Sequence, residues 1–279
     1  MIEAERYKSR VEETVAFLAA RLARTPEIVI ELGTGLGSLA GAMEIDLSLP
    51  YGDIPHFPRA TVTSHAGNLV CGQLGGRPVA VLQGRLHCYE GYSAMEVAFP
   101  IRVLSLLGAE TAIITNAAGG LNTAFVPGSI MVFTDHINLL GLNPLRGPNV
   151  DEWGPRFPDL SRPYDRNLID SALTVAAELG LGNIKTGTYV CVPGPSLETP
   201  AETRFLQLCG ADAVGMSSIP EILVAIHGGM RVLGLSVIAN VNDPDRPQPV
   251  LLEEIVKTAQ ETGPVLQKLI RGIVARYRE

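Results

Sequence analysis

The apolar positions of the chain follow two different periods. Near the N-terminus they recur every three or four residues, which is the spacing of one face of an α-helix. These positions are Tyr7, Val11, Val15, Leu18 and Leu22. Pro26 marks the end of that helix, and the β-branched, almost continuously apolar run Ile28–Leu32 follows it. Such a run predicts a strand that is buried on both faces of a parallel sheet.

The same two patterns alternate to the end of the chain. Further strands are predicted at 69–74, 79–83, 111–115, 130–133, 186–192, 213–214 and 232–239, and further helices at 95–107, 164–179, 198–208, 220–227 and 251–277. Gly75 and Gly76 separate the first two of these strands and indicate a hairpin. The alternation predicts an α/β fold, with one domain over residues 1–279 and a mostly parallel mixed β-sheet covered by helices on both faces.

The segment 141–163 has neither period. Its prolines are Pro144, Pro148, Pro155, Pro158 and Pro163. Long ordered loops within a compact domain are usually functional, so we expect this loop to take part in binding or assembly.

The composition narrows the class of protein. Hydrophobic residues make up 46% of the 279 positions, which is enough for a large core and excludes a disordered chain. The net charge of −7 argues against nonspecific binding to nucleic acid, which needs a basic surface. No run of about 18 apolar residues is present to cross a membrane. Because only 18% of the residues are charged, we expect another subunit to cover part of the surface.

The cysteines and the N-terminal residues indicate in which cellular compartment the protein is expected. The first ten residues are charged and lack the apolar segment of a signal peptide. Cys71, Cys88, Cys191 and Cys209 form no C-x-x-C pair and have no zinc-finger spacing to histidines. We therefore expect four buried free thiols, a cytoplasmic location and no metal site.

Residues that suit an anion follow the predicted strands. In open α/β sheets, ligands bind beyond the carboxyl ends of the strands. The segments found there are Gly33-Thr34-Gly35, Gln83 to Tyr89, Asn116-Ala117, Glu198, Met216-Ser217 and Asn240. They supply hydroxyls, a guanidinium, an imidazole and the backbone amides of a glycine-rich turn, which together favour an oxyanion site.

Each of these signals has an ordinary structural alternative. The glycine turn resembles a dinucleotide fingerprint, but its third glycine comes one place early, and Asp53 lies in a turn rather than after a second strand. A purely structural glycine turn also stays open. Taken singly, Arg85 could form a surface salt bridge and His87 could be a core histidine. Their shared position after strands favours the functional interpretation.

Several longer motifs occur in a characteristic order. They are Gly33-Thr34-Gly35-Leu36-Gly37, Tyr51-Gly52-Asp53-Ile54-Pro55, Ser64-His65-Ala66-Gly67, Gln83-Gly84-Arg85-Leu86-His87, Thr115-Asn116-Ala117-Ala118-Gly119-Gly120, Asp135-His136-Ile137-Asn138, Asn143-Pro144-Leu145-Arg146-Gly147-Pro148-Asn149, Gly194-Pro195-Ser196-Leu197-Glu198-Thr199 and Gly215-Met216-Ser217. From about Leu32 to Asn240 the chain resembles the trimeric class of purine nucleoside phosphorylases.

The resemblance implies a pentosyltransferase with a nucleoside phosphorylase-like fold. Its reaction would be the reversible phosphorolysis of 6-oxopurine ribo- and deoxyribonucleosides, such as inosine and guanosine. The products would be the free purine and ribose (or deoxyribose) 1-phosphate. The enzyme would be a cytoplasmic homotrimer of purine salvage. It would need no cofactor, and inorganic phosphate would be a co-substrate.

The same resemblance assigns roles to single residues. It implies a phosphate site made of Thr34, Arg85, His87, Asn116, Ala117 and Ser217. The purine would contact Leu197, Glu198, Val214 and Asn240, and the ribose would contact His65, Tyr89, Met216, Leu252 and the neighbouring subunit's Phe157. His87, Glu198 and Asn240 would be catalytic. The Glu198 carboxylate would accept from purine N1–H, and the Asn240 amide would stabilise negative charge that develops on the N7 and O6 side.

Three positions depart from the family pattern and keep other functions open. Thr34 stands where serine is usual, Leu197 where an aromatic ring usually stacks on the base, and Leu252 where a histidine often reaches the ribose 5′-hydroxyl. Leu252 would suit a phosphorylase of 5′-methylthioinosine or 5′-methylthioadenosine, although Asn240 argues against adenine. A nucleotide-binding protein without turnover is the third possibility, and phosphate-dependent release of purine would exclude it.

Overall fold

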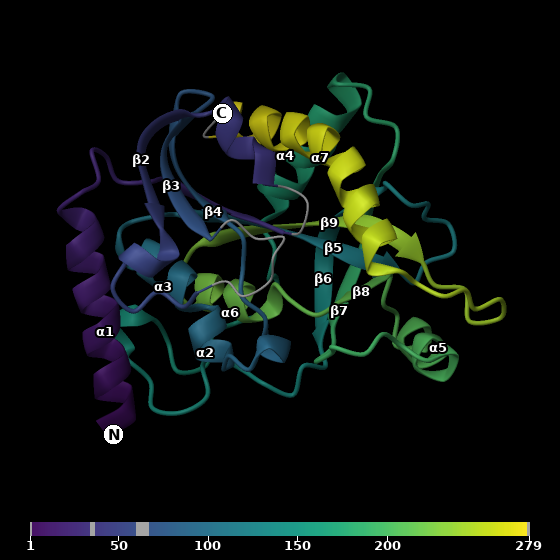
Figure 1. Ribbon diagram of the computed structural model, residues 1–279, viewed down its shortest axis with the longest axis horizontal. Coiled ribbons are helices and arrows are strands. Elements are labelled where there is room, and N and C mark those ends of the chain that lie inside the picture. Colours follow the sequence, from purple (N-terminus) through teal and green to yellow (C-terminus); the bar gives the residue numbers. More distant parts are fainter. Residues whose placement is uncertain (1, 34–36, 60–66, 278–279) are drawn as a thin grey trace.

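The computed structural model describes residues 2–33, 37–59 and 67–277 (Figure 1). The described strands form one nine-stranded mixed sheet in the order β2-β3-β4-β1-β5-β8-β7-β6-β9. Their bounds are β1 (Ile28–Leu32), β2 (Glu44–Pro50), β3 (Asn68–Leu74), β4 (Arg77–Gln83), β5 (Thr111–Gly120), β6 (Ile130–Asn138), β7 (Ile184–Cys191), β8 (Ala213–Gly215) and β9 (Arg231–Val241). Parallel pairings are in the majority, as the sequence predicts.

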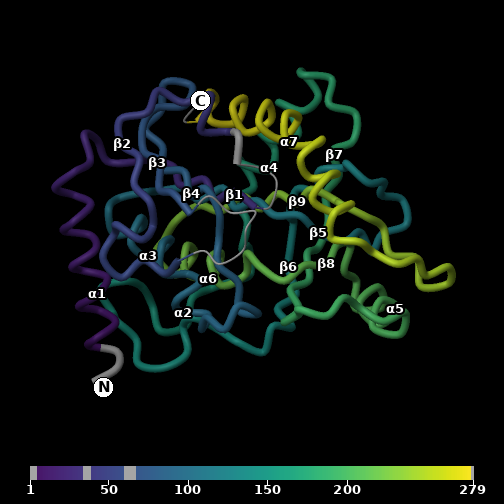
Figure 2. The backbone as a smooth tube through the Cα atoms, viewed as in Figure 1, coloured from purple at the N-terminus to yellow at the C-terminus, as the bar shows by residue number. Residues whose placement is uncertain are grey.

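Helices cover both faces of this sheet. They are α1 (Ile2–Ala19), α2 (Ala94–Val97), α3 (Phe99–Leu106), α4 (Arg166–Glu178), α5 (Pro200–Leu208), α6 (Ile219–His227) and α7 (Leu252–Ala275). Val29 of β1 belongs to one core cluster with α1, α3 and α6, whereas the adjacent Ile30 belongs to a second cluster with α4 and α7. Figure 2 shows these two helix layers on opposite sides of the strands. Burial on both faces explains why the β1 run is almost continuously apolar.

The strands β5 to β9 close into a ring. β5 is parallel to β9 and antiparallel to β8, while β6 joins β7 to β9, so these five strands form a ring. At one end of the ring, Gly119 is in register with both Val214 of β8 and Asn240 of β9. The closure therefore brings three segments that are distant in the sequence to one point.

The structure differs from the sequence prediction in several places. The predicted helix 95–107 is divided into α2 and α3, next to Pro100. Strand β2 was not predicted; it pairs with β3 at the sheet edge and is mostly exposed, although Ile45, Leu47 and Leu49 alternate with polar residues as in a half-buried strand. β5 and β6 continue beyond the predicted 111–115 and 130–133. Helix α5 begins at Pro200 rather than at Glu198, because Thr199 caps it by accepting from the Glu202 amide. Cys209 is exposed and Cys88 is half-buried, whereas all four cysteines were expected to be buried.

The loop 141–163 is confirmed as a long connection, interrupted only by a short 3₁₀ turn at Asp151–Trp153 in the described chain. Among the described helices, none combines the length and the apolar character that crossing a bilayer requires.

Candidate active site

A cavity of about 1060 Å³ opens where β5, β8 and β9 end. Its wall contains every described residue that the resemblance assigned within one subunit: Arg85, His87, Tyr89, Asn116, Ala117, Leu197, Glu198, Val214, Met216, Ser217, Asn240 and Leu252. Thr34 and His65 lie outside the described residues. Phe157 does not line this cavity; it is 86% exposed on the surface. The structure thus gathers the predicted set from six different segments.

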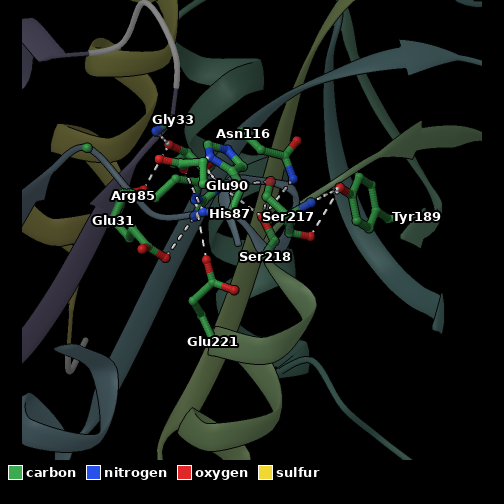
Figure 3. A network of polar contacts seen from close by, with 12 residues as sticks. Glu31, Gly33, Arg85, His87, Glu90, Asn116, Tyr189, Ser217, Ser218 and Glu221 are labelled. Atoms are coloured by element: carbon green, nitrogen blue, oxygen red, sulfur yellow. Dashed lines mark hydrogen bonds and ion pairs between the residues drawn. The ribbon is translucent and has the colours of Figure 1, made fainter. Parts of the chain in front are cut away.

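Arg85 lines the cavity, and its side chain is almost entirely buried. It lies within the network of polar contacts drawn in Figure 3. One terminal nitrogen, Nη1, donates to the Thr115 carbonyl (2.8 Å) and to the Ser217 and Ser218 hydroxyls (3.2 and 3.0 Å). The surface salt bridge considered from the sequence is therefore wrong. The guanidinium instead organises two hydroxyls at the end of β8.

Two buried carboxylates hold this guanidinium from the other side. Glu31 Oε2 accepts from Arg85 Nη2 at 2.7 Å, and Glu221 Oε1 lies 3.4 Å from Arg85 Nε. Burial raises the pKa of both carboxyls, and for Glu221 burial together with repulsion from Glu31 raises the pKa to about 8. A pKa of about 8 favours the protonated form of Glu221 at neutral pH, whereas the Arg85 guanidinium opposes the effect of burial on Glu31.

His87 follows Arg85 by two positions and lines the same cavity. Its Nδ1 lies 2.8 Å from Glu90 Oε1, which also accepts from the His87 backbone N–H at 2.8 Å. Burial and the positive charge of Arg85 lower the pKa of His87 to about 4, so the imidazole is neutral at pH 7. A neutral ring with a carboxylate at Nδ1 donates from Nδ1, which fixes its tautomer. The ring stacks on Tyr89 with centroids 4.5 Å apart.

Asn116 of β5 extends the same polar network. Its Nδ2 donates to Ser218 Oγ at 2.8 Å, and its Oδ1 accepts from Ser236 of β9 at 2.5 Å. Gly33 lies against this strand so closely that an added Cβ would come within 2.7 Å of Asn116 Cα. Only glycine allows the end of β1 to approach β5 in this way. This part of the cavity wall therefore presents amides, hydroxyls and a buried cation, which suits an oxyanion.

The cavity wall also carries Glu198 and Asn240. Glu198 precedes α5, and burial raises the pKa of its carboxyl. Asn240 lies near the end of β9 and donates from Nδ2 to Asn242 Oδ1 at 2.6 Å, and Asn242 in turn donates to Glu198 Oε2 at 3.3 Å. Apolar wall is supplied there by Val214 and Leu197. An acceptor and an amide beside an apolar wall suit the polar edge of a planar heterocycle.

Four residues of the site were missed from the sequence: Glu31, Ser218, Glu221 and Asn242. A weak signal existed for two of them. Glu31 is the only charged residue in the run Ile28–Leu32, and Glu221 is the only one in α6 apart from its terminal His227. An acidic residue inside an apolar element needs a buried partner. Nothing local indicated which partner either one would meet.

The fold and the cavity define an α/β protein with polar groups gathered beyond the ends of its strands, and comparison with known proteins identifies the family. Residues 27–275 match the phosphorylase superfamily. The chain is 49% identical over 270 residues to purine nucleoside phosphorylase 1 of Bacillus subtilis (strain 168), covering 97% of this chain and 99% of the relative. It is 44% identical to the purine nucleoside phosphorylase of Mus musculus, covering 93% and 92%.

Solved structures give the same result. Schistosoma mansoni purine nucleoside phosphorylase in complex with inosine matches with a TM-score of 0.92 and 40% identity over 97% of both chains. The same enzyme in complex with adenosine matches equally well, over 97% of this chain and 98% of that chain. The chain belongs to the phosphorylase superfamily. Within that superfamily it is a member of the purine nucleoside phosphorylase family.

The protonation of Glu221 makes a prediction about stability. Its pKa is raised from an ordinary 4.5 to about 8 in the folded state, so the folded chain keeps a proton that the unfolded chain releases. The free energy of unfolding should therefore fall as pH rises from about 5 to 8. Glu221→Gln carries no such proton, and its melting temperature relative to the wild type should increase over that range.

Thermal unfolding of both proteins between pH 5 and 8.5 measures this difference. Glu253→Gln, on the exposed face of α7, is the control and should show no pH-dependent gap. A gap between Glu221→Gln and the wild type that stays constant with pH would contradict a buried protonated carboxyl.

Proposed function

We propose that this chain catalyses the reversible phosphorolysis of 6-oxopurine nucleosides to free purine and ribose 1-phosphate. One observation carries the proposal: a single cavity joins the oxyanion subsite at Arg85 and Ser217 to the base subsite at Glu198 and Asn240. Membership of the purine nucleoside phosphorylase family supports it. The enzyme is a cytoplasmic homotrimer in this proposal and uses phosphate as co-substrate without a cofactor.

Phosphate occupies the oxyanion subsite. Ser217 Oγ accepts from Arg85, which leaves its own proton to donate to a phosphate oxygen. The Ala117 backbone, Asn116 and His87 complete the subsite, with Thr34 as a further hydroxyl. Since Glu31 already compensates the charge of Arg85, much of the binding comes from oriented hydrogen-bond donors. The bound phosphate attacks the anomeric carbon while the glycosidic bond breaks through an oxocarbenium-like ribose.

The ribose lies between the two subsites. Tyr89, Met216 and Leu252 line this part of the cavity, with His65 as the fourth proposed contact. Tyr89 is held by its stacking on His87, so the ribose wall and the phosphate subsite share one support. Exclusion of water from this region prevents hydrolysis of the sugar cation.

The purine presents its polar edge to Glu198 and Asn240. An ionised Glu198 accepts from N1–H, and the Asn240 amide stabilises the charge that develops on the base as the bond breaks. Adenine has no N1–H, so its N1 lone pair would face the half-buried Glu198 carboxylate. The related schistosome enzyme has been solved with both inosine and adenosine, so the discrimination proposed here concerns turnover rather than occupancy.

A 5′-methylthio nucleoside is not the favoured substrate. Leu252 motivates that alternative because it cannot bond a hydroxyl. However, the relatives at 42% to 49% identity are named purine nucleoside phosphorylases, and the matching structures include complexes with inosine and guanosine.

The first prediction for this function concerns phosphate. Hypoxanthine release from inosine should require phosphate, and Ser217→Ala should raise the KM for phosphate about tenfold, since a hydrogen bond to a charged group contributes about 1.5–3 kcal/mol. Steady-state kinetics at varied phosphate measures it, with Ser48→Ala on the exposed edge strand as the control. Purine release that is equally fast without phosphate would identify a hydrolase instead.

The second prediction concerns the base. Asn240→Asp should shift the preference toward adenosine, because an ionised carboxylate accepts from the 6-amino group and repels O6. The measurement is the ratio of kcat/KM for inosine and adenosine in both proteins. A wild type that prefers adenosine, or a ratio that the substitution does not move, would refute the assignment of the purine subsite.

The third prediction concerns assembly. Phe157 is 86% exposed on the loop 141–163, so its ring is available to a neighbouring surface. In the proposed trimer it reaches the ribose pocket of the neighbouring subunit. Phe157→Ala should raise the KM for inosine more than the KM for phosphate. Sedimentation that shows a fully active monomer would contradict this arrangement.

A further inference from the structure

Asn242 lies between the two residues that recognise the base, although neither motif nor family pattern singled it out. It follows β9 directly, and its backbone N–H donates to the Gly120 carbonyl at 2.8 Å, which anchors it to the end of β5. Its side-chain amide accepts from Asn240 Nδ2 at 2.6 Å and donates to Glu198 Oε2 at 3.3 Å. Asn240, Asn242 and Glu198 thus form a continuous relay along the wall of the cavity.

The chemistry of the relay allows only one orientation of each amide. An ionised carboxylate only accepts hydrogen bonds, so Asn242 must turn its Nδ2 toward Glu198. Asn242 Oδ1 then faces Asn240, so the atom of Asn240 that donates to it must be Nδ2. If Asn240 turned over, two carbonyl oxygens would stand at the present 2.6 Å separation. The negative charge of Glu198 therefore determines, through Asn242, how Asn240 is turned.

We infer that Asn242 is a positioning residue that locks Asn240 in the orientation required by a 6-oxopurine. The Nδ2 end of Asn240 points toward Asn242 and through it toward Glu198. When a 6-oxopurine donates its N1–H to Glu198, its O6 atom lies next to N1 and faces Asn240 Nδ2. One N–H of Nδ2 is used by Asn242, and the second N–H donates to O6. The 6-amino group of adenine would meet a donor there. This inference rests on the proposed function and explains why the amide does not simply rotate to suit either base.

Asn242 also acts on Glu198. The carboxyl must be ionised to accept from N1–H, whereas burial raises its pKa and the negative charge of Glu202 raises it further. The hydrogen bond from the backbone N–H of Glu198 and the smaller contribution of the hydrogen bond from Asn242 both lower the pKa. The other charged residues in the cavity wall are Arg85 after β4, Asp243 and Arg246 on the loop after β9, and Glu254, Lys257 and Glu261 on α7. Of the side chains named here, Asn242 is the one that donates a hydrogen bond to the carboxylate.

Two substitutions separate the two effects. Asn242→Ala removes both hydrogen bonds, so Asn240 is free to turn, and the ratio of kcat/KM for inosine to that for adenosine should fall about tenfold, the size of one lost hydrogen bond. Asn242→Asp still accepts from Asn240 and keeps it turned, but it cannot donate to Glu198. Its ratio, measured above the acid limb of the pH profile, should stay close to that of the wild type.

The pH dependence supplies the second readout. In both variants the acid limb of kcat/KM for inosine should move to higher pH, and it should move further in Asn242→Asp because a negative charge is added beside Glu198. Asn122→Ala is the matched control, since the Asn122 amide also donates to a carboxylate, Asp212, at 2.8 Å but lies outside the cavity wall. This control should change neither the ratio nor the limb.

The outcomes distinguish the two proposals. If the wild type does not release hypoxanthine from inosine with phosphate, the proposed function is wrong. If it does, and Asn242→Ala keeps both the wild-type ratio and the wild-type acid limb, the relay has no positioning role. The inference is also wrong if the inosine-to-adenosine ratio falls equally in Asn242→Ala and Asn242→Asp. That result would mean that the oxygen of residue 242, which accepts from Asn240, does not control the orientation of Asn240. Thermal melting of each variant shows that it is folded at the assay temperature.

Discussion

The buried guanidinium of Arg85 is the interaction on which the rest of the site depends. It joins Glu31 of β1, the Thr115 carbonyl of β5, the hydroxyls after β8 and Glu221 of α6. Removing one partner from such a buried pair leaves an uncompensated charge and costs about 3–5 kcal/mol. The cluster therefore ties the central strands to the helix that covers them, at the point where the oxyanion subsite lies.

This cluster is also close to electrical neutrality. With Glu221 protonated, one carboxylate compensates one guanidinium, and a second buried negative charge beside an anion site is avoided. The same cation lowers the pKa of His87 and keeps its imidazole neutral. Arg85 therefore shapes the protonation of its neighbours as well as their positions. An anion that enters the cavity meets oriented N–H and O–H groups supported by one fixed positive charge.

The base subsite is organised by the opposite sign of charge. Glu198 lies at the start of a relay in which each amide is turned by its neighbour, and Gly119 leaves room for this relay beside β5. An added Cβ at Gly119 would come within 3.2 Å of Asn242 Nδ2. The closed ring of strands brings β5, β8 and β9 together here, so backbone topology and side-chain chemistry meet at the same end of the sheet. One fixed charge in each subsite thus orders the neutral polar groups around it.

Much of this architecture follows from local patterns in the sequence. The apolar periods located nearly every central strand and helix, because burial on one or two faces imposes a period that neighbouring residues must share. The position of candidate side chains after strands was enough to gather Arg85, His87, Ser217, Glu198 and Asn240 as one set, since parallel strands end at a common edge. The edge strand β2 was missed although Ile45, Leu47 and Leu49 alternate with polar residues, which is the period of a half-buried strand.

Tertiary structure alone decided which groups meet. Glu31 and Arg85 are 54 positions apart, and Asn242 and Glu198 are 44 apart, so no local period relates either pair. The pKa of Glu221 likewise depends on its burial and on the distance to a charge from another strand. The sequence by itself determined the kind of fold and most residues of the cavity wall that were proposed for the site, but not Glu31, Ser218, Glu221 or Asn242. Their partners, protonation and orientation arise only when the chain closes, because hydrogen bonds and charge interactions act over a few ångströms in space, whatever the separation along the chain.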